Sequence, residues 1–77
     1  MEKEMQFKSI VAQYCDVAPE DMTSEMRFRE DLGFSSLDFM SFLGELEDTF
    51  DVELEESGVL QIITVGEALD MLNDLVA

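Results

Sequence analysis

The sequence has no histidine and no tryptophan, and it has only one cysteine and one proline. Without histidine, no Ser-His-Asp or Cys-His catalytic arrangement can form. The single Cys15 cannot close an intramolecular disulfide, and one cysteine without histidine excludes the ordinary zinc sites. No nucleophile has a base to activate it, so we expect no enzymatic activity and no metal centre.

Basic residues are also scarce, with four against 19 acidic residues and a formal net charge of −15. All four (Lys3, Lys8, Arg27 and Arg29) lie in the first 29 residues, and from Glu30 onward 13 acids face no base. Such a charge repels nucleic acid and anionic membrane surfaces, and it attracts proteins with basic patches. We therefore expect protein partners with basic docking surfaces, no nucleic acid and no membrane insertion.

Long apolar runs are missing as well. No stretch approaches the roughly 18 apolar residues of a membrane span, and the first five residues lack the basic region and apolar run of a signal peptide. The length of 77 residues, of which 47% are hydrophobic, is typical of one small globular domain. These features predict a cytoplasmic protein with a single domain over residues 1–77.

Apolar residues recur at helical spacing in three stretches, residues 5–14, 36–50 and 65–76. The first has Phe7, Ile10, Val11 and Tyr14 on one face. Ser35 with Asp38, and Thr64 with Glu67, match the pattern in which a hydroxyl and a carboxylate cap the start of a helix. The sequence therefore predicts three main helices.

The segments between these helices are predicted to be loops and connectors. Residues 15–35, with Pro19 and Gly33, predict a long loop. Residues 51–63 predict a connector with a short helical turn near its end, where Val59, Leu60, Ile62 and Ile63 cluster. Since no segment alternates like a strand, the expected fold is all-α: a small acidic bundle of three main helices plus one short helix, with a long loop between helices one and two.

Two serines stand at the junction between the long loop and the second helix, within Asp31-Leu32-Gly33-Phe34-Ser35-Ser36-Leu37-Asp38. They can be read as capping residues only. They can also be read as the site of a phosphate ester, because the first N–H groups of a helix and its dipole favour an anion there.

The same segment resembles the modification region of acyl carrier proteins. That family has an Asp-Leu-Gly turn, then Asp-Ser-Leu-Asp, then an apolar helix that ends in acids, Phe and Asp. The positions that match in this region are Asp31, Leu32, Gly33, Ser36, Leu37, Asp38, Leu46, Glu47, Phe50 and Asp51. The start of the last helix, Ile63-Thr64-Val65-Gly66, matches too, and the resemblance covers essentially the whole chain.

The resemblance implies a carrier that holds acyl intermediates as thioesters. Its cofactor would be a covalent 4'-phosphopantetheine arm, derived from coenzyme A and attached to Ser36. Its partners would be a phosphopantetheinyl transferase and enzymes of fatty acid biosynthesis or related lipid metabolism, and it would be a monomer. One departure is that Ser35 stands where the family usually has Asp, which retains the cap but loses a charge, and which keeps Ser35 as the second candidate for attachment.

Two further sets of residues follow from the second helix and its surroundings. An exposed apolar and acidic surface beside Ser36 is expected to dock partner enzymes, and its residues are Leu37, Asp38, Met40, Glu45, Glu47 and Asp48. An apolar interior is expected to line a cavity for the acyl chain, although simple core packing would explain the same residues: Phe39, Phe42, Leu46, Ile62 and Ala68.

Two alternative functions stay open at this point. One is a specialised carrier for polyketide, peptidyl or D-alanyl transfer. The other is an acidic interaction protein that lacks the arm.

Overall fold

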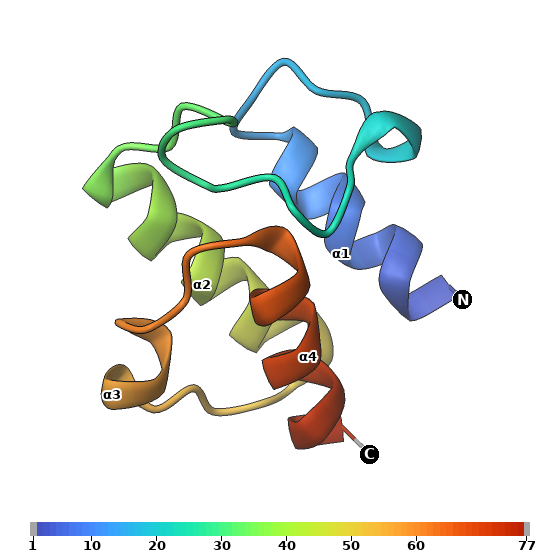
Figure 1. Cartoon of the computed structure of the whole chain (residues 1–77). Coiled ribbons are helices and arrows are strands. Elements are labelled where there is room, and N and C mark those ends of the chain that lie inside the picture. Colours follow the sequence, from blue (N-terminus) through green and yellow to red (C-terminus); the bar gives the residue numbers. More distant parts are fainter. Residues whose placement is uncertain (1, 77) are drawn as a thin grey trace.

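The computed structural model describes residues 2–76. Its elements are α1 (Glu2–Ala12), a 3₁₀ turn (Pro19–Asp21), α2 (Ser36–Phe50), α3 (Glu56–Val59) and α4 (Val65–Val76) (Figure 1). In this part of the chain no strand forms, and the extended backbone meets only in one isolated antiparallel bridge between Arg27 and Thr64. The all-α prediction, with three main helices and one short helix, is confirmed. No helix within residues 2–76 is long and apolar enough to cross a membrane.

The helix bounds differ from the prediction at two places. The first helix spans residues 2–12 instead of 5–14, and an ion pair of 3.1 Å between Lys8 and Glu4 links its successive turns. The short helix occupies Glu56–Val59, within the predicted connector of residues 51–63, but it begins ahead of the apolar cluster that suggested it and includes only Val59 of that cluster. Of that apolar cluster only Val59 is buried, and Leu60 and Ile63 are largely exposed.

The core is built on aromatic rings from α1, α2 and the long loop. Phe42 is fully buried and packs edge-on against Phe7 of α1, with ring centroids 5.7 Å apart. Phe28 and Phe34, both from the loop, lie 5.2 Å apart and also contact Phe42. Aliphatic residues complete the buried core: Ile10, Val11, Met22, Leu32, Leu43, Leu46, Val59, Val65, Ala68 and Leu72.

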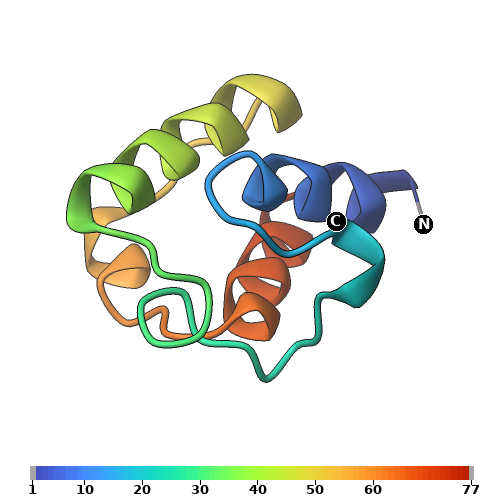
Figure 2. The same ribbon diagram turned by 90° about the horizontal axis from the view of Figure 1, so that it is seen from above.

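The long loop of residues 13–35 is held by backbone hydrogen bonds to the start of α4. Figure 2 shows the green part of the loop crossing the orange segment that leads into α4, and three hydrogen bonds join these segments. Phe28 N donates to Ile63 O at 2.9 Å, Val65 N to Met26 O at 2.9 Å, and Gly66 N to Ser24 O at 3.0 Å. The last two bonds satisfy amides at the start of α4 that no helical carbonyl can reach. They also fix the path by which the chain enters α2.

Candidate functional site

The two serines at the start of α2 have different surroundings. Ser35 is the N-cap: its Oγ accepts a hydrogen bond from Asp38 N at 3.1 Å, and Asp38 Oδ2 accepts one from Ser35 N at 3.2 Å. Ser36 is the first helical residue, it is exposed, and its hydroxyl takes no part in the cap. The cap therefore occupies the Ser35 hydroxyl and leaves the Ser36 hydroxyl directed outward.

A cation from the long loop reaches the Ser36 hydroxyl. The Arg29 guanidinium Nη2 donates a hydrogen bond to Ser36 Oγ at 2.9 Å, across seven residues of sequence. Arg29 is one of only four basic residues in the chain. The electrostatic surroundings of Ser36 are therefore less negative than the net charge of the molecule suggests.

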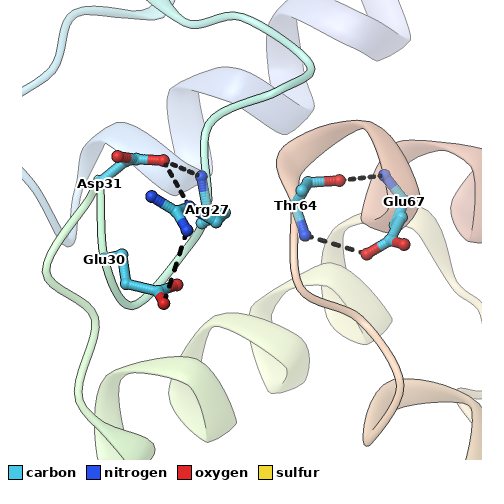
Figure 3. A network of polar contacts seen from close by, with 5 residues as sticks. All are labelled: Arg27, Glu30, Asp31, Thr64 and Glu67. Atoms are coloured by element: carbon cyan, nitrogen blue, oxygen red, sulfur yellow. Dashed lines mark hydrogen bonds and ion pairs between the residues drawn. The ribbon is translucent and has the colours of Figure 1, made fainter.

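The loop just before α2 is folded on itself by the Arg27 side chain and backbone (Figure 3). Arg27 N and Nε donate to Asp31 Oδ2 at 2.8 and 3.2 Å, and Glu30 lies 3.6 Å from the guanidinium. The backbone hydrogen bond from Arg27, with help from its side chain, lowers the pKa of Asp31 below its ordinary value. Gly33 then turns the chain with a φ of +76°, a left-handed conformation that favours glycine.

The start of α4, beside this loop, has a capping box of its own (Figure 3). Glu67 N donates to Thr64 Oγ1 at 3.2 Å, and Glu67 Oε1 accepts from Ile63 N and Thr64 N at 2.7 and 3.1 Å. The backbone hydrogen bond from Ile63, followed by that from Thr64, lowers the pKa of Glu67. Both caps predicted from the sequence are therefore present.

The residues expected to dock partners fall into two groups. Leu37 and Met40 are 80% and 63% exposed, and Asp48 is exposed as well. Asp38 is half-buried within the cap of α2. The leucine and the methionine form an apolar surface on α2 within one turn of Ser36.

The other two docking candidates also hold the fold together. Glu45 Oε1 accepts a hydrogen bond from the Tyr14 hydroxyl at 2.7 Å, and this bond is the main cause that raises the pKa of Tyr14. Glu47 Oε2 accepts from Leu54 N at 2.9 Å, which ties the connector to α2. Neither bond was visible in the sequence, because each depends on how a distant segment folds back on α2.

The residues expected to line a cavity fall into a fully buried group and a half-buried group. Phe42, Leu46 and Ala68 are fully buried in the core. Phe39 and Ile62 are half-buried, and they line a pocket of about 580 Å³ between the loop, α2 and α3. The other residues that line this pocket are Arg27, Phe28, Arg29, Glu30, Val59, Leu60 and Ile63. The sequence analysis missed Arg29, because its reach to Ser36 and to this pocket depends on the tertiary path of the loop.

Comparison with known proteins identifies the family. The family model described as "Phosphopantetheine attachment site" matches residues 6–72. The chain is also 32% identical over 68 residues to an acyl carrier protein of Sulfurovum sp., which covers 88% of this chain and 91% of that protein. The chain belongs to the acyl carrier protein family. Its cofactor is therefore phosphopantetheine. As for carrier proteins in general, its partners are biosynthetic enzymes and a phosphopantetheinyl transferase.

Two further relatives agree with this family. An acyl carrier protein of Saccharopolyspora erythraea is 36% identical over 70 residues, which cover 91% of this chain and 74% of that protein. The solved structure of the acyl carrier protein from Enterococcus faecalis superposes with a TM-score of 0.82 at 28% identity, over 96% of this chain and 95% of the other. The bundle described above is thus the fold of acyl carrier proteins.

The residues at the start of α2 fit such an arm. A phosphodiester link needs an accessible hydroxyl and surroundings that tolerate its negative charge. Ser36 offers the first, and Arg29 together with the N-terminus of α2 offers the second. When bound, such an arm would supply a thiol.

Proposed function

We propose that this acyl carrier protein holds acyl intermediates as thioesters on a 4'-phosphopantetheine arm attached to Ser36 Oγ, and that it presents them to biosynthetic enzymes without catalysing a reaction itself. We choose Ser36 over Ser35 because the two hydroxyls have different roles at the start of α2. The Ser35 hydroxyl accepts the capping hydrogen bond, whereas the exposed Ser36 hydroxyl is left for modification.

The pocket that is lined by Arg29, whose guanidinium contacts Ser36, supports a role in sheltering cargo. Its volume of about 580 Å³ and its apolar wall, which includes Phe39 and Ile62, suit the first part of an acyl chain. The fully buried Phe42, Leu46 and Ala68 lie in the adjoining core, where a longer chain would have to displace side chains. We propose that the pocket takes short acyl groups without rearrangement of this core.

The docking surface of this proposal is the outward face of α2. Leu37 and Met40 provide an exposed apolar anchor, and Asp38 and Asp48 provide charge beside it. Glu45 and Glu47 add negative charge while they hold Tyr14 and the connector in place. Such an apolar centre within an acidic surround suits enzymes with basic docking patches.

Fatty acid biosynthesis is the pathway that we propose, since a strongly acidic carrier can serve many separate enzymes through charge attraction. A specialised carrier for polyketide, peptidyl or D-alanyl transfer is the second candidate, and the uncharged Ser35 beside the attachment residue favours it. The cytoplasmic location, the monomeric state and the single domain over residues 1–77 stay predictions.

The first test is intact mass after incubation with coenzyme A and a broad-specificity phosphopantetheinyl transferase. We expect one added phosphopantetheine on the wild type, one on Ser35→Ala and none on Ser36→Ala. Addition to Ser36→Ala but not to Ser35→Ala would move the attachment to Ser35. No addition to any of the three proteins would overturn the proposal in favour of an acidic interaction protein without the arm.

A further inference from the structure

Arg29 stands apart from the other charged residues around Ser36. Within residues 2–76, the ion pairs of the structure involve Lys8 and Arg27, and none involves Arg29. The guanidinium of Arg29 instead donates to the neutral Ser36 hydroxyl at 2.9 Å. In a chain with 19 acids and four bases, a cation directed at a hydroxyl calls for a physical explanation.

Three carboxylates between Arg29 and the first turn of α2 have other donors as partners. Glu30 and Asp31 both pair with Arg27, at 3.6 and 3.2 Å. Asp38 accepts the backbone N–H of Ser35. The residue before Ser36 is itself uncharged. These three carboxylates, which follow Arg29 in the sequence, thus have donors other than the Arg29 guanidinium, and that guanidinium contacts Ser36.

The backbone that carries Arg29 is held firmly. The preceding residue, Phe28, is 2% exposed, its N–H donates to Ile63 O at 2.9 Å, and its carbonyl accepts from Phe34 N at 2.8 Å. Arg29 therefore begins from a fixed point at the edge of the core. A side chain that starts from a fixed point loses less freedom when it binds a ligand.

A guanidinium presents several N–H donors in a planar fork, and its preferred partners are carboxylate and phosphate oxygens. Attachment of phosphopantetheine converts Ser36 Oγ into one ester oxygen of a phosphodiester. The two non-bridging oxygens of that group share the negative charge, and each would be two bonds from Oγ, through phosphorus, so that the same guanidinium could bind them. The contact seen at 2.9 Å, from a charged guanidinium to a neutral hydroxyl, would thereby become a contact between opposite charges.

We propose that Arg29 is the phosphate-anchoring residue of this carrier: its guanidinium binds the non-bridging oxygens of the phosphodiester at Ser36 and directs the root of the arm toward the pocket beside α2. Arg29 itself lines that pocket together with Phe39, Ile62 and Ile63. The anchored phosphate would therefore lie between the attachment oxygen and the pocket mouth. This inference rests on attachment at Ser36, and Arg29 acts in it as a positioning residue.

The test compares the melting temperatures of the apo and holo proteins at low salt, after intact mass has shown that each holo sample carries one arm. The three proteins are the wild type, Arg29→Gln and Lys8→Gln. The last removes the same charge from α1, where Lys8 contacts Glu4 and Met22 instead of the serine.

We expect attachment of the arm to change the melting temperature more favourably in the wild type than in Arg29→Gln. The difference between the two apo-to-holo changes should be roughly 1–5 °C, which is the size of effect that an exposed charge pair has in a domain of this length. Lys8→Gln should keep the wild-type change, and added salt should reduce the difference at Arg29. An equal apo-to-holo change in the wild type and Arg29→Gln would overturn the proposal.

A second measurement uses the wild type alone and applies even if the transferase fails to modify Arg29→Gln. The Nε–Hε resonance of Arg29, assigned by its absence from the apo variant, should shift and exchange more slowly with water when the arm is attached. An unchanged resonance would overturn the anchoring role while leaving attachment at Ser36 intact. Absence of the arm from wild-type Ser36 would instead contradict the proposed function.

Discussion

At the scale of single residues, the surroundings of Ser36 depend on a few carboxylates that accept backbone hydrogen bonds. Asp31 holds the turn at Arg27, Asp38 caps α2, and Glu67 caps α4. Each carboxylate lies at a point where the backbone would otherwise leave N–H groups unpaired. A large part of the order around the site therefore comes from charged oxygen atoms, in a molecule that already has an excess of them.

The lowered pKa of Glu67 gives this capping a measurable pH dependence. Because the folded state disfavours protonation, the stabilisation is fully present above the ordinary carboxyl value of 4.5 and is lost as the pH falls through the lowered value. Glu67→Gln keeps an oxygen acceptor for the cap but cannot titrate. We expect its urea midpoint to fall less than that of the wild type between about pH 6 and about pH 3.

The control for this experiment is Glu53→Gln, which removes an exposed carboxylate outside the helix caps. Its pH profile should follow the wild type. Parallel profiles for Glu67→Gln and the wild type would show that the hydrogen bonds from Ile63 and Thr64 do not change the proton affinity of Glu67.

At the scale of elements, periodicity and caps were enough to predict α2 and α4 with their bounds, because each has an apolar stripe and a capping pair. The short helix was placed too late, since exposed Leu60 and Ile63 were read as core residues. Ser36 was chosen from its place in a motif. Arg29 was missed, because its contact with Ser36 depends on the bonds between the loop and α4, which no local pattern encodes.

Two glycines test how closely the loop and α4 pack. A Cβ on Gly66 would lie 2.9 Å from Ser24 Cβ and 3.2 Å from Ser24 O, whereas a Cβ on Gly44 of α2 would meet nothing within 4 Å. We expect Gly66→Ala to destabilise the fold by roughly 1–3 kcal/mol because neither Ser24 atom is a flexible end. Gly44→Ala should stabilise it by about 0.5–1 kcal/mol through helix propensity.

Urea denaturation of both variants measures these changes, and Gly44→Ala is the matched control for the loss of glycine flexibility. Equal free energies of unfolding in the two variants would mean that the loop can move away from α4 at little cost.

At the scale of the whole molecule, the dominant feature is the uneven charge. The sequence places every base in its first 29 residues, two of them, Arg27 and Arg29, lie in the loop that precedes Ser36, and the fold brings Arg29 into contact with the Ser36 hydroxyl. The outward face of α2 beside this loop carries acids and two exposed apolar side chains. A partner that docks as proposed would therefore meet a negative surface with an apolar centre, and an arm at Ser36 would begin next to a cation.

This arrangement predicts how the transferase reaction responds to salt. We expect kcat/KM to fall by about tenfold or more as NaCl rises, because charge attraction speeds the encounter. Leu37→Ala should lower kcat/KM at every salt concentration, by roughly tenfold, and leave the melting temperature unchanged, since Leu37 is 80% exposed.

Leu75→Ala, which removes an exposed leucine near the end of α4, is the control and should behave as the wild type does. A rate that does not depend on salt, or equal kcat/KM values for Leu37→Ala and Leu75→Ala, would contradict docking through the outward face of α2.

The bonds between the long loop and α4 have a consequence for proteolysis. They join residues 28 and 63, 26 and 65, and 24 and 66, so this part of the loop can detach only if these bonds break and the first amides of α4 lose their partners. A protease needs a freed, extended segment, so we expect these bonds to slow cleavage within residues 24–28. A loop of this length is ordinarily cleaved easily, but in this carrier the cleavage rate should depend on how firmly the loop is held against α4.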